Sequence, residues 1–114
     1  MKTKLLAFIL ALSFIEAYAQ YTMIPDANFE QALINLEIDS NMTPDGQVLT
    51  TEISSVTSLD ITNLGISNLA GIEGFTALET LICRFNNLTS VNLASNTSLT
   101  YLDLFENSLT TINV

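Results

Sequence analysis

The residue types that usually carry catalysis are scarce in this 114-residue sequence. There is no histidine, so a Ser-His triad and an imidazole metal site are both excluded. The one cysteine, Cys83, falls at an inward position of a predicted strand, where a buried thiol is inert. Asp60 and Asp103 share an outward position two strands apart, about 9–10 Å at the spacing of parallel strands, within the range of an inverting glycosidase. No groove for a sugar ring can be argued from so few strands, so we interpret them as a solvated pair and expect no enzyme activity.

A second stretch has the residue types of a cation-binding loop. Taking Asp45-Gly46 as positions five and six of an EF-type loop places Asn41 first, Thr43 third and Glu52 twelfth, where a bidentate carboxylate is expected. Only two of these side chains are carboxylates, so a calcium site here would be weak. The alternative, which we favour, is a Pro-Asp-Gly turn that leads into a strand, with no cofactor.

The elements that must position these residues follow from a repeated pattern. Eleven-residue rows begin at Val56, Leu78 and Leu99, so their starts are 22 and then 21 residues apart. They read V-x-x-L-x-I-x-x-L-x-I, L-x-x-L-x-C-x-x-N-x-L and L-x-x-L-x-L-x-x-N-x-L. Self-similarity at this period is typical of solenoids, in which each unit is stabilised by stacking on its neighbours.

Within each row the alternation of apolar and polar residues predicts a short, half-buried parallel strand. The asparagines at the ninth position, Asn86 and Asn107, can hydrogen-bond the turn backbone with both amide and carbonyl, and should stack as a ladder. The first row has Leu64 there, and we expect it to make an apolar contact beside the N-terminal cap instead.

The outward strand positions line the concave face, where solenoids commonly bind ligands. Arg84 is surrounded there by apolar and aromatic residues, the composition of an interface hot spot. Exposed apolar side chains at these positions have no role in the core. The predicted contact residues are Asp60, Ile82, Arg84, Phe85, Tyr101, Asp103 and Phe105.

These rows resemble the leucine-rich repeats of secreted and surface bacterial proteins of the internalin type. The segment 24–33, with Ile24-Pro25-Asp26-Ala27-Asn28-Phe29 and then Ala32-Leu33, is similar to the capping helix that opens such proteins. The resemblance covers roughly residues 24–114. It implies an α/β right-handed solenoid with short parallel strands on its concave face and an N-terminal capping helix, and it specifies the fold far better than the function.

The cap itself has a helix signature. Asp26 after Pro25 is suited to be an N-cap, and Phe29, Leu33 and Leu36 follow at helical spacing on one face. We expect the helix at about 27–36, inside a cap of residues 20–50. The repeats would occupy residues 51–114, about three in number with the last incomplete, so we expect the sequence to be part of a longer array.

The first nineteen residues predict export. Lys2 and Lys4 precede an apolar run, and Ala17-Tyr18-Ala19 has small residues at both positions of a cleavage site, as in a signal peptide cleaved near Ala19. The run is too short to span a membrane, so no membrane insertion of the mature chain is expected. The remaining residues carry 11 acids and one base, Arg84, a net charge of −10 that disfavours nucleic acid.

Two functions remain open at this point. The first is a secreted or cell-surface module that binds a protein or glycan, and so mediates adhesion, through its concave face. The alternative is a structural spacer of a larger surface protein that binds nothing, with or without a weak calcium-stabilised cap loop.

Overall fold

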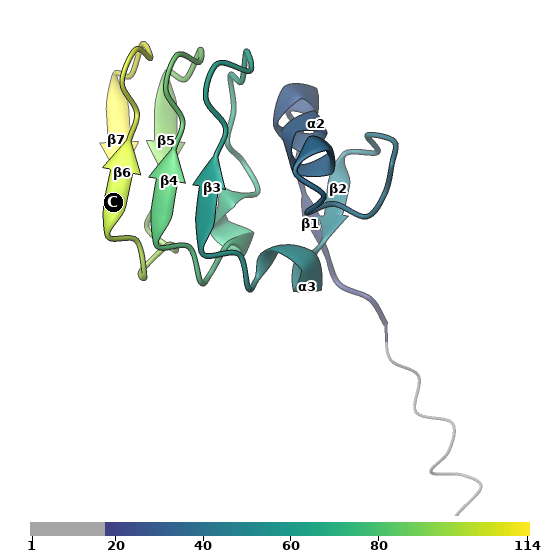
Figure 1. Ribbon diagram of the computed structural model, residues 1–114. Coiled ribbons are helices and arrows are strands. Elements are labelled where there is room, and N and C mark those ends of the chain that lie inside the picture. Colours follow the sequence, from purple (N-terminus) through teal and green to yellow (C-terminus); the bar gives the residue numbers. More distant parts are fainter. Residues whose placement is uncertain (1–17) are drawn as a thin grey trace, which may run out of the picture.

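Two parallel sheets run through the repeats in the computed structural model, which describes residues 18–114 (Figure 1). The first sheet has the strand order β3–β4–β6, and the second pairs β5 with β7. Ser58 pairs with Thr80 and Thr80 with Tyr101, which confirms the alignment of the three sequence rows. The strands are β3 (Ser58–Asp60), β4 (Thr80–Ile82), β6 (Tyr101–Asp103), β5 (Ser90–Asn92) and β7 (Thr111–Asn113).

The N-terminal part adds an antiparallel strand pair and a helix beside β3 (Figure 1). Strands β1 (Tyr21–Met23) and β2 (Gln47–Leu49) flank helix α2 (Ala27–Asn35), and a single helical turn, α3 (Thr50–Ile53), leads to the repeats. A 3-10 turn, η1 (Ile72–Gly74), lies between β3 and β4.

Helix α2 begins where the sequence predicts and ends one residue earlier. Asp26 caps it by accepting hydrogen bonds from the backbone N–H groups of Asn28 and Phe29, at 2.9 and 3.1 Å. Phe29 and Leu33 are buried as expected, but Leu36 is 48% exposed. The expectation for Leu36 was wrong because the helix ends at Asn35, so Leu36 no longer lies on the helix face that faces the core.

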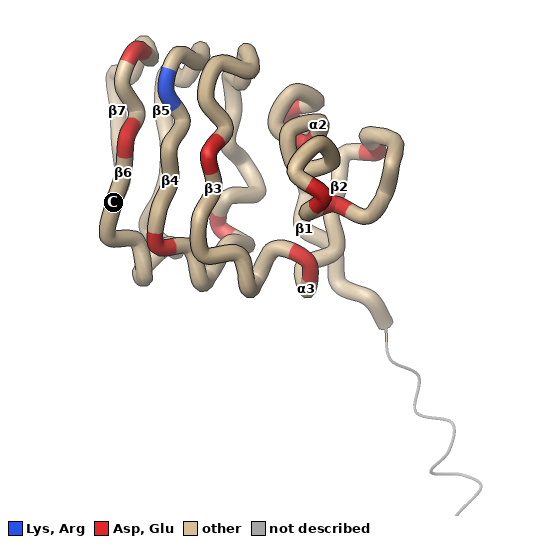
Figure 2. Tube along the Cα trace, viewed as in Figure 1, with Lys and Arg blue, Asp and Glu red and all other residues tan. Residues whose placement is uncertain are grey.

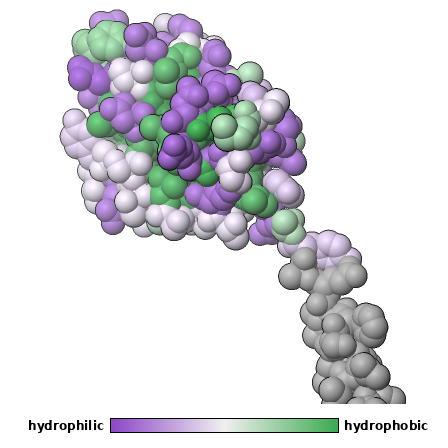
Figure 3. All heavy atoms as spheres, turned by 45° about the vertical axis from the view of Figure 1, so that its right-hand side comes forward, coloured by the Kyte–Doolittle hydropathy of each residue, from purple (hydrophilic) through white to green (hydrophobic). Residues whose placement is uncertain are grey.

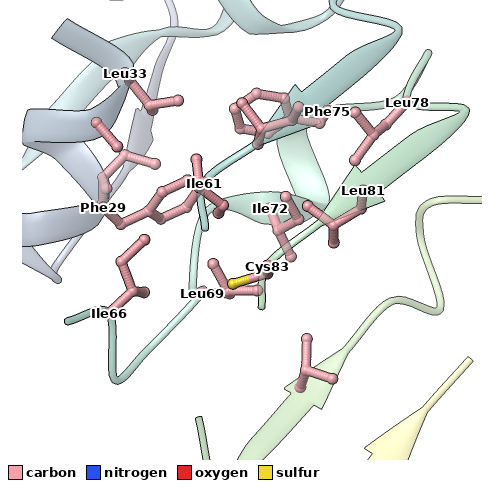
Figure 4. Packing of buried hydrophobic residues seen from close by; sticks show 14 of the residues in the cluster. Phe29, Leu33, Ile61, Ile66, Leu69, Ile72, Phe75, Leu78, Leu81 and Cys83 are labelled. Atoms are coloured by element: carbon pink, nitrogen blue, oxygen red, sulfur yellow. The ribbon is translucent and has the colours of Figure 1, made fainter. Parts of the chain in front are cut away.

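One hydrophobic core continues from α2 into the repeats (Figure 4). The ring of Phe29 from the helix stacks on Phe75 of the first repeat, with centroids 6.2 Å apart. Leu59 and Leu81, the middle residues of β3 and β4, are fully buried in the same cluster. The helix therefore covers the apolar side of the first repeat, which no earlier repeat covers.

Asparagines join successive repeats. The side-chain oxygen of Asn86 accepts from the backbone N–H groups of Leu64 and Ile66, and its amide donates to the carbonyl of Ile61. Asn107 accepts from the N–H of Leu88 and donates to the carbonyls of Cys83 and Leu104. Each asparagine thus closes its own turn onto the turn before it.

The first repeat is joined to the helix by a different residue. Leu64, at its ninth position, is 42% exposed, so the expected apolar contact was wrong. The second carboxylate oxygen of Asp26 instead accepts from the N–H groups of Ser67 and Asn68, at 2.9 and 3.0 Å. Asp26 therefore caps the helix and holds the turn of the first repeat at the same time.

Burial decreases at the far side of the repeats. Leu102, Leu104 and Leu109 are partly buried against the core, and Ile112 is 50% exposed. Residues 1–17, on which most of the predicted signal peptide falls, lie outside the described residues. Within residues 18–114, no helix has the length and apolar character needed to cross a membrane.

Candidate binding site on the strand face

The outward side chains of β3, β4 and β6, with the residues that directly follow each strand, form one surface, which we call the strand face. The register places Asp60, Ile82 and Asp103 side by side in one column across the three strands. Arg84, the one basic residue among residues 18–114, follows two residues after the end of β4. Figure 2 colours basic residues blue. The strand face therefore carries the one positive charge of residues 18–114.

Arg84 is held by three side chains. Its Nε lies 3.4 Å from Oδ2 of Asp103, an ion pair across neighbouring strands. The guanidinium carbon is 5.8 Å from the ring centroid of Phe85 and 5.3 Å from that of Phe105. Those two rings meet edge to face with centroids 5.7 Å apart, a geometry that aromatic pairs favour. The structure thus brings four of the predicted contact residues into one cluster, the Arg84 cluster: Arg84, Phe85, Asp103 and Phe105.

The two phenyl rings remain open to solvent. Phe85 is 49% exposed and Phe105 is 54% exposed, although each contacts the other and the guanidinium. Tyr101, also 54% exposed, is the strand-face residue at the start of β6. Side chains this apolar and this exposed on neighbouring repeats leave hydrophobic area that a partner could cover.

The backbone of Phe85 has an unusual conformation. Its φ is 53°, in the left-handed region that bulky side chains rarely adopt. Asn63 and Glu106, the equivalent residues of the first and third repeats, also have positive φ, at 57° and 56°. The turn therefore requires this conformation in every repeat, and the second repeat places a phenylalanine there at a local energetic cost.

Asp60 does not join the Arg84 cluster. It is exposed, and its Oδ1 accepts from the N–H of Thr62, a contact within its own turn. Ile82 separates it from Asp103 in the register, and Oδ1 of Asp103 accepts from the N–H of Phe105. The two carboxylates thus have separate local roles, and the arrangement contains no paired acid and base.

The predicted cation loop is only partly assembled. Asn41, Asp45 and Glu52 line a cavity of about 190 Å³, but Thr43 does not. Asp39, which is outside the predicted set of ligands, lines the same cavity and is 3% exposed. Among the described residues, no group of three or more acidic, cysteine or histidine side chains is arranged to hold a metal ion.

The environment of Asp39 disfavours its charged form. Burial raises the pKa of the Asp39 carboxyl above its usual value; the backbone N–H of Asn41 lowers it, and the charges of Glu52 and Asp45 raise it again. One of its oxygens, Oδ2, is buried without a hydrogen-bond partner. The loop therefore contains a carboxylate whose ionisation opposes folding.

The turn beside this cavity is held by a buried carboxylate that sequence reasoning missed. Glu30, in the first turn of α2, is 1% exposed and accepts hydrogen bonds from the N–H groups of Asp45 and Gly46, at 2.7 and 2.8 Å. Its partners lie 15 and 16 residues away, so no local sequence signal identifies the contact. Glu30 thus holds the backbone of Asp45 and Gly46 just before β2 begins at Gln47.

Cys83 is buried under the strand face. Burial raises the pKa of its thiol to about 11; a hydrogen bond from the side-chain amide of Asn86 lowers it, and the charge of Asp60 raises it. The amide nitrogen lies 3.2 Å from the sulfur. A thiol that stays protonated at neutral pH and is closed to solvent is a poor nucleophile.

Comparison with known proteins places this architecture among leucine-rich-repeat proteins. Internalin J of Listeria monocytogenes serotype 4b (strain F2365) is 44% identical over 46 residues, which are 40% of this chain and 5% of that protein. The functional domain of InlJ from Listeria monocytogenes, described as including a cysteine ladder, matches with a TM-score of 0.69 and 34% identity. That match covers 82% of this chain and 21% of the InlJ chain.

Two further solved structures support the fold alone, because their sequence identity is low. They are the internalins InlF (TM-score 0.64, 23% identity) and InlC2 (TM-score 0.64, 21% identity) of Listeria monocytogenes strain 4b F2365. The InlF match covers 79% of this chain and 30% of that structure; the InlC2 match covers 86% and 50%. No protein-family profile matches the chain. The chain thus spans half or less of the length of the relative and of the structures that it matches.

Proposed function

Because this chain is an internalin-like leucine-rich-repeat protein, we propose that it is a secreted or cell-surface module that binds a protein partner through its strand face. The observation that carries this proposal is the exposed aromatic pair beside Arg84, the one basic residue among residues 18–114. Phe85 and Phe105 are each about half exposed and contact Arg84, so the surface combines apolar area with a positioned charge. Binding energy in protein interfaces concentrates in such aromatic and arginine residues.

The strained backbone at Phe85 supports the same proposal. Asparagine occupies the equivalent turn in the first repeat and suits a positive φ far better than phenylalanine does. A residue that costs local stability, and whose side chain is open to solvent, is expected where that side chain serves recognition. A spacer that binds nothing would gain nothing from a strained, exposed phenylalanine at this position.

The proposal is tested by adhesion of the purified full chain. Beads coated with the chain are counted on animal-cell monolayers and on wells coated with extracellular-matrix proteins. We expect Phe105→Ser to lower bead retention at least about tenfold, the size of effect typical of a hot-spot residue.

The matched control is Ile112→Ser on β7. Ile112 is 50% exposed, close to the 54% of Phe105, but it lies in the other sheet. Retention should be unchanged by this control. Equal retention for the wild type, Phe105→Ser and Ile112→Ser would reject strand-face binding and leave the structural spacer as the function.

A further inference from the structure

We propose that Arg84 is an anion-recognition group whose two terminal amino groups bind one carboxylate of the partner. The inference rests on the proposed binding function and names the chemistry that the strand face selects. It follows from how the guanidinium is oriented, from what surrounds it and from the charge of the rest of the surface.

The guanidinium of Arg84 is oriented by Asp103. Nε of Arg84 is buried and faces Asp103, while the side chain as a whole is 43% exposed. Neither terminal nitrogen is hydrogen-bonded to a described residue, and neither is buried without a partner. Both are therefore accessible to solvent. The guanidinium turns its inner edge toward the protein and presents its outer edge, a planar pair of amino groups, to an incoming ligand.

The surroundings fix that orientation. Asp103 is itself held, because its other oxygen accepts from the N–H of Phe105. The two phenyl rings contact the guanidinium and reduce the freedom of a side chain that is otherwise flexible. An arginine that is immobilised before binding loses less entropy for each hydrogen bond that it forms, and apolar walls strengthen a charge-assisted bond. A carboxylate matches the outer edge of the guanidinium in a bidentate geometry.

The surrounding charge limits the ligand. The carboxylate of Asp103 already neutralises the charge of Arg84. Two more acidic residues are exposed nearby: Asp60 lies in the same column as Asp103, and Glu106 lies in the turn after β6. A strongly acidic ligand would be repelled by these groups and by the net negative charge of the chain. The ligand that fits is a protein segment with one aspartate or glutamate next to apolar side chains, which would cover Phe85 and Phe105.

The test is an NMR titration of the purified full chain, labelled with nitrogen-15, with N-acetylglutamate N-methylamide. Sodium chloride at matched ionic strength is the control. We expect saturable shifts of the Arg84 side-chain N–H signals and of the Phe105 amide with the carboxylate, and none with chloride. Arg84→Lys keeps the charge but lacks the planar pair of donors, and should weaken the binding at least about fivefold. Shifts that are equal in chloride, or unaffected by Arg84→Lys, would overturn the inference.

A second arm separates the sources of the carboxylate. Sodium glucuronate replaces the peptide analogue, and tighter binding of glucuronate would overturn the choice of a protein ligand. The adhesion assay separates this inference from the proposed function. If Phe105→Ser abolishes adhesion while Arg84→Lys retains it and no titration shift appears, strand-face binding stands and carboxylate recognition fails. If Phe105→Ser also retains adhesion, the proposed function fails as well.

Discussion

The turn that follows each strand of the first sheet contains one residue with a positive φ. The side chain at this position differs between the three repeats: it is Asn63, Phe85 or Glu106. In the first two repeats a backbone hydrogen bond to the next repeat supports this conformation: the N–H of Asn63 donates to the carbonyl of Arg84, and that of Phe85 donates to the carbonyl of Phe105. The backbone is thus the same in each repeat, and the side chain is free to vary with function.

Substitution at Phe85 can separate backbone strain from lost ring contacts. Phe85→Asn and Phe85→Ala both remove the ring, but asparagine suits the left-handed region better than alanine. We expect Phe85→Asn to be more stable than Phe85→Ala by about 1 kcal/mol in urea denaturation. Phe105 has no positive φ, so Phe105→Asn should show no such advantage over Phe105→Ala. An alanine variant that is equally stable at position 85 would contradict the strain argument.

Cys83 should make the fold sensitive to alkaline pH. The pKa of its thiol is about 11 in the folded chain, against 9.0 for an unperturbed cysteine, so the folded state binds this proton more tightly. The stabilisation is complete below pH 9 and is lost as the pH rises from 9 to 11. We expect urea midpoints of the wild type to fall more steeply across this window than those of Cys83→Val. Parallel profiles for the two proteins would contradict the assignment.

At the scale of elements, the helix and the first repeat share one side chain. Each carboxylate oxygen of Asp26 accepts two backbone N–H groups. One oxygen accepts from the first turn of α2, and the other accepts from Ser67 and Asn68. The core supports the same joint through the stacked rings of Phe29 and Phe75. The helix is therefore attached to the repeats by polar and apolar contacts together.

Removing this carboxylate should loosen the joint. We expect Asp26→Ala to lower the free energy of unfolding by about 2–3 kcal/mol, because a helix cap and the hydrogen bonds to the first repeat are lost together. Asn28→Ala removes one exposed hydrogen bond to the carbonyl of Gly65 and should cost about 1 kcal/mol or less. Chemical denaturation followed by circular dichroism measures both. Equal losses for the two variants would show that Asp26 acts only locally.

The elements that the sequence predicts well are those with a strong period. Alternation over each row predicted β3, β4 and β6 and the columns that they form, and the N-cap signal located the start of α2. Strand β2 follows the Pro-Asp-Gly segment as the turn interpretation predicted. The strands β1, β5 and β7 were missed, because they lie outside the three aligned rows and no repeated pattern marks them.

The side chains that the sequence could not place are held by distant partners. The roles of Glu30 and Asp26 depend on backbone groups 15 to 42 residues away. Leu64 and Leu36 were misplaced because a row or a helix face was assumed to continue where the chain turns. Within the candidate site, the columns followed from register, but the Arg84–Asp103 pair and the edge-to-face rings depend on rotamers that no pattern encodes.

Charge acts on the molecule as a whole. Acidic residues are spread over the described part of the chain (Figure 2), and Arg84 is the one basic residue there. Figure 3 shows hydrophilic and hydrophobic residues intermixed over the face that carries α2, β1 and β2. Self-repulsion between the carboxylates opposes the compact state, and salt screens it over about 10 Å at 0.1 M ionic strength.

The melting temperature should therefore rise with salt. We expect Tm to increase between 10 and 300 mM sodium chloride, a range over which the Debye length falls roughly from 30 to 6 Å.

Calcium and magnesium chloride at equal ionic strength should give equal melting midpoints, because the cap loop has no assembled metal-binding group. A rise specific to calcium that Glu52→Gln abolishes would instead assign a calcium site to the loop.

The double role of Asp26 also bears on the order of folding. Its bonds to the first repeat join residues 41 and 42 positions apart, whereas the Asn86 bonds between repeats join residues 20 to 25 apart. Closing a loop of twice the length costs only about 0.6 kcal/mol more. The helix can therefore dock while the repeats are still assembling, so the open apolar side of the first repeat need not be exposed for long in a folding chain.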